Sequence, residues 1–386
     1  MTVASSPPPP ARAAEWRGKV EEALLPPLVA LLIAMVAGDI LILSFGQSPG
    51  DVYRLLIEGT WGNPYGLGQV LFKTTTLLFT GLAVSLGIRA GLFNIGAEGQ
   101  LAAGGFAAAV MGLALPGATP ALIAVPLAML AAAAGGGVVG LVPGVLKARF
   151  GAHEVIVTIM LNFIVLALLN YAIVAHLNVA ETLHTPEMRA GSIPRLSDFI
   201  GALHGSSVNV SLFVALAAAV AVGWFLFRTR GGYELRATGL QPDAAEYGGV
   251  RVGSVWIRTL ALSGMLAGLG GINYVLGYKH YYEEGFAAGS GFLGIAVALV
   301  GRNHPVGVVL AALLFATLSQ GGLAIHALVP KQMVEVLQGI VILAVAACVP
   351  EVRRVLSVGR LAPAARHRSY DDPQASSTRS PTAPTP

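Results

Sequence analysis

The chain has little charge. Asp, Glu, Lys and Arg make up only 11 % of its 386 residues, whereas hydrophobic residues make up 55 %. A soluble domain carries about 25 % charged residues. The composition therefore indicates an integral membrane protein. The basic pI of about 9.3 requires no nucleic-acid partner, because membrane proteins concentrate Lys and Arg in their cytoplasmic loops.

The chain also lacks the residue patterns of catalytic centres. Its single cysteine, Cys348, excludes an intrachain disulfide. There is no G-x-x-x-x-G-K-[ST] phosphate loop, no H-E-x-x-H zinc motif and no nucleophile elbow. We therefore expect no catalytic residue, no metal and no cofactor bound by this chain, and no ATP hydrolysis by the chain itself.

Long apolar runs are abundant instead. A transmembrane helix needs about 20 apolar residues, and ten runs of suitable composition can be placed. They lie at about 24–45, 68–88, 94–114, 121–145, 155–175, 209–227, 257–277, 288–301, 306–327 and 332–350. We predict an all-α, polytopic membrane protein with about ten transmembrane helices, some of them discontinuous or re-entrant.

The two ends of the chain differ from this pattern. Residues 1–22 include the run SSPPPP and predict a disordered head, and residues 356–386, rich in Ser, Thr, Pro and Ala, predict a disordered tail. Residues 23–355 form the predicted transmembrane domain. Its first run is long for a signal peptide and has no convincing cleavage site after it, so we interpret it as an uncleaved span.

The basic residues are distributed unevenly among the predicted loops. If the N-terminus is cytoplasmic, 18 of the 24 Lys and Arg residues fall in cytoplasmic segments. This is the asymmetry that the positive-inside rule requires. We expect a multi-pass protein of the plasma membrane with both termini in the cytoplasm.

Polar residues interrupt the apolar sequence most clearly in residues 91–101, which read GLFNIGAEGQL. Asn94, Glu98 and Gln100 would each cost a few kcal/mol at membrane depth, so they should face a lined cavity or a partner. Asn94 and Glu98, four residues apart, share one helical face. One interpretation is the lining of a path for a polar solute; the other is a protonated or hydrogen-bonded Glu98 that holds a broken helix in place.

The fifth run adds Thr158 and Asn162, which lie one helical turn apart. Such a stripe either lines a cavity or forms hydrogen bonds between helices, which is the commoner use of polar residues in membranes. The candidates for a translocation path are thus Asn94, Glu98, Gln100, Thr158 and Asn162.

Two loops are long enough to have structure of their own. The external loop at about 176–209 predicts a small cap. The cytoplasmic loop at about 228–258 contains Pro242 at a first-turn position, acidic residues near the positive end of the helix dipole, and Gly248-Gly249 as a stop signal. These signals predict a short exposed helix over 242–247 that serves as a docking element.

Four motifs in order complete the pattern: GLFNIGAEGQL, HEVIVTIMLNFI, GYELRATGLQPDAAEYGGV and GFLGIAVALVGRNHPVGVVLAALLF. Together they resemble ABC-transporter permeases of the branched-chain amino acid and simple-sugar type, and within that group the nucleoside (simple-sugar) branch. The resemblance extends from about Gly66 to Pro350.

The resemblance implies the partners. In such systems two permeases form the pore, an ABC ATPase that uses ATP and Mg docks on their cytoplasmic loops, and a substrate-binding protein, often a lipoprotein, delivers the substrate outside. In this branch the second permease is usually a related but different chain, and the two ATPase domains are often fused. The ATPase-coupling loop would comprise Pro242, Ala244, Ala245, Glu246, Tyr247 and Gly249.

The resemblance therefore implies a permease subunit of an ATP-driven nucleoside importer in the lipid bilayer of a bacterial inner membrane. The nearest alternative is the same type of permease for a simple sugar or a branched-chain amino acid. From a different class, a stand-alone ion-coupled carrier would need no ATPase partner, and the docking-type loop argues against it. A membrane scaffold without transport would leave Glu98 unexplained.

Overall fold

The computed structural model describes residues 32–177, 182–286, 288–326 and 332–344, together with Val29, Val179, Leu328 and Pro330. The chain divides into two units, one formed by residues 34–343 and the other by the two ends of the chain. The predicted head (1–22), the predicted tail (356–386) and Cys348 lie outside the described residues. The following sections concern the unit of residues 34–343.

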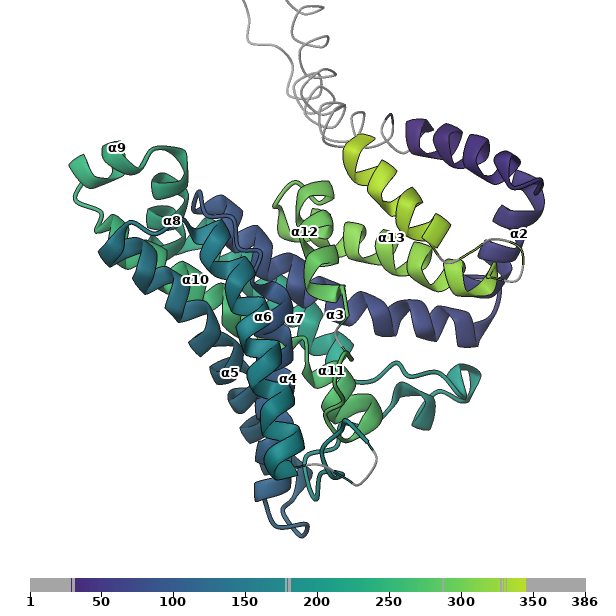
Figure 1. Ribbon diagram of the computed structural model, residues 1–386, viewed down its shortest axis with the longest axis horizontal. Helices are drawn as coiled ribbons and strands as arrows, with labels where there is room; N and C mark the ends of the chain where they lie inside the picture. Colours follow the sequence, from purple (N-terminus) through teal and green to yellow (C-terminus); the bar gives the residue numbers. More distant parts are fainter. Residues whose placement is uncertain are drawn as a thin grey trace, which may run out of the picture. The chain divides into compact units, whose positions relative to one another are not determined.

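Helices dominate the part of the chain that the structure describes, where strand pairing is limited to the isolated bridges His184–Glu283 and Arg195–Asn209. The labelled α-helices are α2 (Pro49–Thr60), α3 (Pro64–Arg89), α4 (Ala97–Ala114), α5 (Ala121–Phe150), α6 (Glu154–Ala172), α7 (Ser211–Arg228), α8 (Arg230–Leu240), α9 (Pro242–Tyr247), α10 (Val252–Leu269), α11 (Ile272–Tyr274), α12 (Ser290–Val300) and α13 (Pro305–Ala324) (Figure 1). Short π-helical turns η1 (Ile173–Leu177) and η4 (Val275–Lys279) extend α6 and α11, and 3-10 turns η2 (Leu196–Asp198) and η3 (Gly201–Leu203) lie in the loop of residues 182–209. Two further helices, Leu32–Ser44 and Gln332–Ala344, stand at the two ends of the described chain.

The helices confirm the prediction of an all-α polytopic membrane protein. Within the described residues, six helical segments are long and apolar enough to cross a bilayer, and Leu32–Ser44 with α2 would make a seventh span, bent by 112°. Each of the ten predicted apolar runs is helical over most of its described part. Helix α12 has only 11 residues, which give it a length of about 16 Å, or half the hydrocarbon thickness. It is therefore one of the predicted discontinuous segments.

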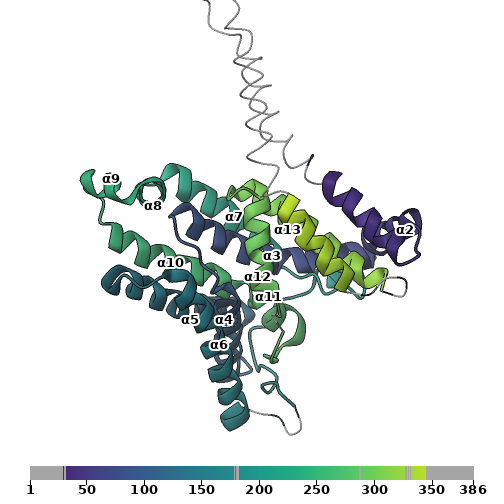
Figure 2. The same ribbon diagram turned by 45° about the horizontal axis from the view of Figure 1, so that its top comes forward.

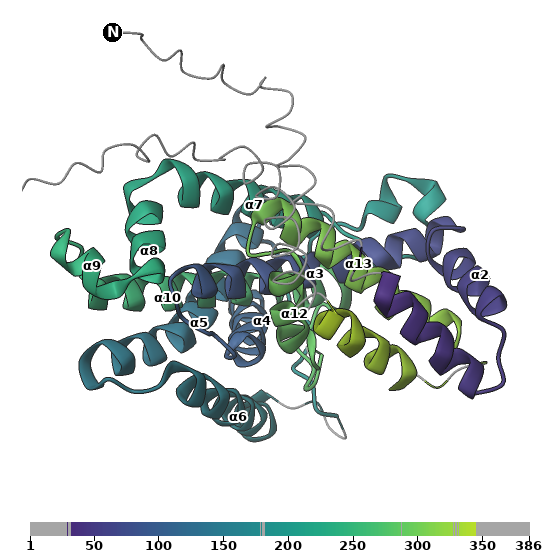
Figure 3. The same ribbon diagram turned by 90° about the horizontal axis from the view of Figure 1, so that it is seen from above.

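Small residues bring α5 and α10 into backbone contact, and Figure 3 shows the two helices side by side. A side chain at Gly264 would meet the backbone of Gly136, and one at Gly140 would meet the backbone of Leu260. In lipid, close approach of this kind replaces the hydrophobic effect as the force that holds helices together. The small residues of α5 and α10 thus form the close contact between these two helices.

Helix α3 lies at the centre of the unit and contacts α7, α10, α12 and α13. It begins at Pro64, where the Asn63 side chain caps the helix by accepting a hydrogen bond from the Gly66 N–H at 2.6 Å. Most of the helix is buried, and Phe79 packs in the same core as Phe315 of α13. Because α3 touches so many neighbours, it fixes the positions of the shorter segments around it.

The helices α8 and α9 stand together beyond the ends of α7 and α10 (Figure 2). Helix α9 begins at Pro242 with Asp243 in its first turn, and it ends at Gly248, followed by Gly249 in the left-handed conformation at φ +83°. The prediction of a short helix over 242–247 is thus confirmed. Helix α8, which precedes it, was not predicted as a separate element.

Candidate functional site

The starts of α4 and α12 meet inside the protein, and a carboxylate joins them. Glu98 Oε1 accepts a hydrogen bond from the Gly289 N–H at 2.8 Å, and Oε2 accepts one from the Gly291 N–H at 2.6 Å. The first N–H groups of a helix have no partner within the helix, and the positive end of the dipole favours an anion. Glu98 therefore satisfies two backbone N–H groups at the N-terminus of α12.

Glycine is required on the other side of this contact. A Cβ atom at Gly291 would land on the backbone of Ala97 and Glu98. The short distance between the two helix starts, which allows the Glu98 carboxylate to reach two backbone N–H groups, depends on the absence of a side chain at position 291.

The loop of residues 90–96 that leads into α4 is held by a polar network. Asn94 Oδ1 accepts from the Gly96 N–H at 2.9 Å, and Asn94 Nδ2 donates to Gln100 Oε1 at 2.9 Å and to Ser263 Oγ at 2.8 Å. Ser263 in turn donates to the carbonyl of Ala83 at 2.6 Å. The network ties the loop to α10 and α3.

Helix α6 supports the same loop from the other side. Thr158 Oγ1 accepts from the Ile95 N–H at 3.3 Å, while Asn162 accepts from the Gly99 N–H and donates to the Ile95 carbonyl, each at 2.9 Å. Non-helical backbone is tolerated at membrane depth only where its polar groups find partners in the protein. Thr158 and Asn162 supply such partners.

The five predicted path residues are thus brought to one place. Asn94, Glu98, Gln100, Thr158 and Asn162 are between 0 and 5 % exposed, and each has a hydrogen-bond partner within the protein. That they line a translocation path stays a prediction. Their contacts favour the second interpretation, in which they hold a broken segment in position.

A cavity with a mixed polar and apolar lining, called the polar cavity below, opens next to Gly289, between α12, α13 and the helix Gln332–Ala344. Its volume is about 1000 Å³, including the space at its mouth. The polar lining groups are Ser290, Ser319, Glu335 and Gln338, together with the backbone of Gly289. The Glu98 carboxylate accepts a hydrogen bond from the Gly289 N–H, and this contact positions one wall of the cavity.

Helix α3 contributes polar groups behind the same cavity. Lys73 Nζ donates to the carbonyl of Ser319 at 3.2 Å and lies 3.3 Å from its hydroxyl, and Thr80 Oγ1 donates to the carbonyl of Ser290 at 3.2 Å. A lysine within a membrane helix is costly and marks a pathway or a partner. Lys73, Ser319 and Gln338 were not among the predicted site residues, although Ser319 and Lys73 each interrupt an apolar run.

Five aromatic rings form a continuous chain of contacts, and one of them, Phe286, lies in the segment that leads into α12. Phe72 contacts Tyr274 with ring centroids 5.0 Å apart, Tyr274 contacts Phe286 at 5.3 Å, Phe286 contacts Tyr282 at 5.2 Å, and Tyr282 contacts Phe106 at 5.4 Å. The contacts are edge-on or tilted, a favoured arrangement for aromatic pairs. Phe286 lies three residues before Gly289, so the rings and the polar cavity share one segment.

The predicted ATPase-coupling residues lie on α9 and the turn that follows it. Tyr247 is 96 % exposed, and Pro242, Ala244, Glu246 and Gly249 are exposed, whereas Ala245 is buried. A fully exposed tyrosine on a two-turn helix has no packing role in this chain. The helix therefore has the accessible face that a docking element requires.

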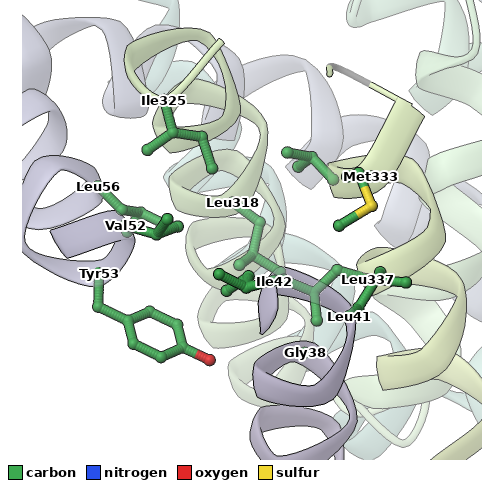
Figure 4. Close-up of a pocket in the computed structure, with 11 residues that line it drawn as sticks. Gly38, Leu41, Ile42, Val52, Tyr53, Leu56, Leu318, Ile325, Met333 and Leu337 are labelled. Carbon is green, nitrogen blue, oxygen red and sulfur yellow. The ribbon is translucent and has the colours of Figure 1, made fainter. Parts of the chain in front are cut away.

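A second cavity has a different character. It lies between the two arms of the bent N-terminal pair, α13 and the helix Gln332–Ala344, and Figure 4 shows Val52, Leu318 and Met333 pointing into it. Aliphatic side chains and the ring of Tyr53 form its walls. Such a cavity offers no polar group to orient a polar solute, so we assign it to packing.

Comparison with known proteins identifies the family of the chain. The family model described as the branched-chain amino acid transport system permease component matches residues 66–346. The guanosine ABC transporter permease protein NupP of Bacillus subtilis is 40 % identical over 84 % of this chain and 93 % of its own length. The nucleoside ABC transporter permease protein NupB of Lactococcus lactis is 34 % identical over 77 % of this chain and 83 % of its own length.

A relative of different specificity is also similar. The glucose ABC transporter permease protein TsgB13 of Haloferax volcanii is 33 % identical over 82 % of this chain and 85 % of its own length. No solved structure gives a significant match.

Proposed function

Because the chain belongs to the family of branched-chain amino acid transport system permease components, we propose that it is the membrane-spanning subunit of an ATP-driven importer of nucleosides. The observation that carries the proposal is the 40 % identity to a guanosine permease over 84 % of the chain. The similarity to a glucose permease supports a simple sugar as the second candidate substrate. In either case the chain transports and does not catalyse.

The proposed orientation follows from the charges. The end of the protein that carries α8 and α9 also carries Lys147, Arg149 and Arg228 at the ends of α5 and α7. Positive residues accumulate on the cytoplasmic side. We therefore place this end in the cytoplasm, together with both termini, and the loop of residues 182–209 outside.

The proposed partners follow from this orientation. A separate ABC ATPase, with ATP and Mg, would dock on α9, and an extracytoplasmic binding protein would deliver the solute to the opposite end. A second, related permease chain would complete the pore. ATP binding would draw the docking helices of the two permeases together and rock their bundles between outward and inward access.

The translocation path is proposed to pass the polar cavity beside α12. Its hydroxyl, amide and carboxylate groups suit the hydroxyls of a ribose. The five predicted path residues would then act indirectly, because their hydrogen bonds hold Gly289 and the start of α4 in place.

Uptake measurements test the proposal. Cells with and without the gene would be given labelled guanosine, a pentose and leucine in parallel. Loss of guanosine uptake alone supports the nucleoside importer. Loss of only the pentose or leucine would keep the importer and change its substrate, whereas unchanged uptake of all three would overturn the importer assignment.

A further inference from the structure

A groove of about 1170 Å³, including the space at its mouth, runs between α7 and α13. Most of its wall is apolar and includes Leu216, Val220, Trp224 and Val306. These side chains are not covered by the chain itself, since Val220 is 74 % exposed and Trp224 is 64 % exposed. In a membrane protein such a face is covered by lipid or by another protein.

One end of the groove is basic. Arg228 and His304 line it together with Phe227. The Phe227 ring stacks on His304 with centroids 5.5 Å apart, and the guanidinium carbons of Arg89 and Arg236 lie 5.3 and 5.4 Å from its centroid. Arg228 and His304 thus line the end of the groove, and Arg89 and Arg236 contact the Phe227 ring that lies beside them.

This positive charge has no carboxylate to balance it. Among the residues that the structure describes, Arg89, Arg228, Arg236 and His304 form no ion pair. By contrast, Arg230, two residues beyond Arg228, pairs with Glu234 at 2.8 Å. Desolvation, and then the charge of Arg89, lower the pKa of His304, so the positive charge of this cluster is that of the three arginines.

An apolar groove that ends in cations without carboxylate partners is complementary to an amphiphile with an anionic head. We propose that the groove binds an anionic phospholipid from the leaflet on the α8–α9 side, with its phosphate at Arg228 and one acyl chain along Val220 and Trp224. Basic pockets between membrane helices on the cytoplasmic side recognise such headgroups. The proposal requires a membrane and the orientation proposed above, but it does not depend on which solute is transported.

The site has a consequence for the docking element. Arg228 ends α7, and Thr229 caps the start of α8, which leads directly into α9. A lipid phosphate at Arg228 would therefore hold the base of the segment that presents α9. This links the lipid composition of the leaflet to the rigidity of the ATPase-docking region.

Trp224 provides a reporter at the site. The full-length chain would be reconstituted into bilayers in which phosphatidylglycerol or phosphatidylcholine carries brominated acyl chains, which quench tryptophan fluorescence on contact. The fluorescence that disappears in a Trp224→Phe variant is that of Trp224, and its quenching measures which lipid occupies the groove.

We expect brominated phosphatidylglycerol to quench Trp224 at about fivefold lower mole fraction than brominated phosphatidylcholine. Arg228→Gln should abolish this preference, whereas the matched change Arg230→Gln should leave it unchanged, because Arg230 is already paired with Glu234. Excess inorganic phosphate should not reverse the preference, because a free anion has no acyl chain.

Three results would overturn the proposal. Equal quenching by both lipids would show that the groove is not selective for an anionic head. A preference that survives Arg228→Gln would place the selective site elsewhere. Absence of Trp224 quenching by either lipid would show that protein, either a second copy or a second permease, covers the groove.

Discussion

The carboxylate of Glu98 lies 2.6 Å from the backbone nitrogen of Gly291, so that the first turn of α4 caps the first turn of α12. The two residues are far apart in sequence and come from two separate motifs. Their contact turns two interrupted helices into one rigid junction beside the polar cavity. The junction, more than any single lining residue, sets the geometry of the proposed path.

Replacement of Glu98 by Gln tests the junction. The amide of Gln can accept through one oxygen only, so one of the N–H groups of Gly289 and Gly291 loses its partner. A buried unsatisfied donor costs about 1–3 kcal/mol. We expect the reconstituted transporter to inactivate faster on heating and to lose uptake, whereas the matched change Glu58→Gln at an exposed position should alter neither. Equal heat resistance of the Glu98→Gln variant and the native chain would contradict the capping role.

The Gly291 side of the junction can be tested by the addition of a methyl group. In Gly291→Ala the new Cβ would collide with the backbone of Ala97 and Glu98, and backbone cannot move aside as a side chain can. Overpacking of this kind costs about 1–3 kcal/mol. We expect little assembled transporter from this variant in membrane fractions.

The control for that experiment is Gly339→Ala. Gly339 is also helical, but apart from its own helix no atom of the described residues lies within 4 Å of the position that a methyl group would take there, and alanine favours helix by about 1 kcal/mol over glycine. Assembly should equal or exceed that of the native chain. A Gly291→Ala variant that assembles as well as Gly339→Ala would refute the close approach of α4 and α12.

The polar cavity yields a third prediction. Gln338→Leu removes an amide from the cavity lining, and the loss of one hydrogen bond of about 0.5–1.5 kcal/mol to a passing solute should slow uptake about two- to tenfold. Thr317→Val is the control because the Thr317 hydroxyl donates to the Leu313 carbonyl of its own helix and the residue does not line the cavity. If the two variants transport guanosine equally well at equal expression, the path does not pass this cavity.

Much of the fold could be predicted from the sequence because helices in membranes are marked by apolar length. The runs predicted at 94–114 and 209–227 correspond to α4 (Ala97–Ala114) and α7 (Ser211–Arg228). Helix α9 was also predicted, since Pro242 and Gly248 fix its ends through local backbone chemistry. Helix α2 was missed because Asp51, Arg54 and Glu58 interrupt its apolar pattern.

The candidate site was only partly predictable. Polar residues within apolar runs identified Asn94 and Glu98, since such residues need partners. Their partners Ser263 and Gly291 lie more than 160 residues further along the chain, and no periodicity connects them. Only the folded arrangement distinguishes a residue that faces a cavity from one that braces a loop.

His280, which contacts the loop of residues 182–209 through the Met188 N–H, gives a prediction about pH. Burial, and then the charge of Arg195, lower the pKa of His280, with a smaller opposing effect of Glu187. An unfolded histidine titrates near pH 6.5. As the pH falls through that value, His280 is protonated in the locally unfolded state before it is protonated in the folded state. This segment therefore loses stability on acidification and regains it at neutral pH.

Hydrogen exchange would detect this effect locally. The Met188 N–H donates to the His280 carbonyl at 2.8 Å, and after correction for intrinsic rates its protection should fall between about pH 7.5 and pH 5.5. In His280→Asn the protection should no longer depend on pH, and asparagine accepts the left-handed backbone found at this position, φ 62°. Protection that is constant with pH in the native chain would rule out the role of His280.

The exposed tyrosine of α9 permits the sharpest test of ATPase docking. Tyr247 is 96 % exposed, so Tyr247→Arg should leave the fold and the expression of the chain intact. If α9 inserts into an ATPase, the loss of a central aromatic contact should cost about 2 kcal/mol or more, since interfacial tyrosines often dominate binding. The variant should fail to retain the ATPase on co-purification and should lose guanosine uptake while the ATPase still hydrolyses ATP.

Tyr65 supplies the matched control for Tyr247, because it is 50 % exposed at the start of α3, the end opposite to Arg89. Tyr65→Arg introduces the same charge on the proposed external side and should leave ATPase retention unchanged. If Tyr247→Arg retained both the ATPase and full uptake, docking on α9 would be excluded while the importer itself remained intact. If Tyr65→Arg released the ATPase and Tyr247→Arg did not, the orientation of the chain would be reversed, because docking would then occur at the end of α3 that begins at Pro64.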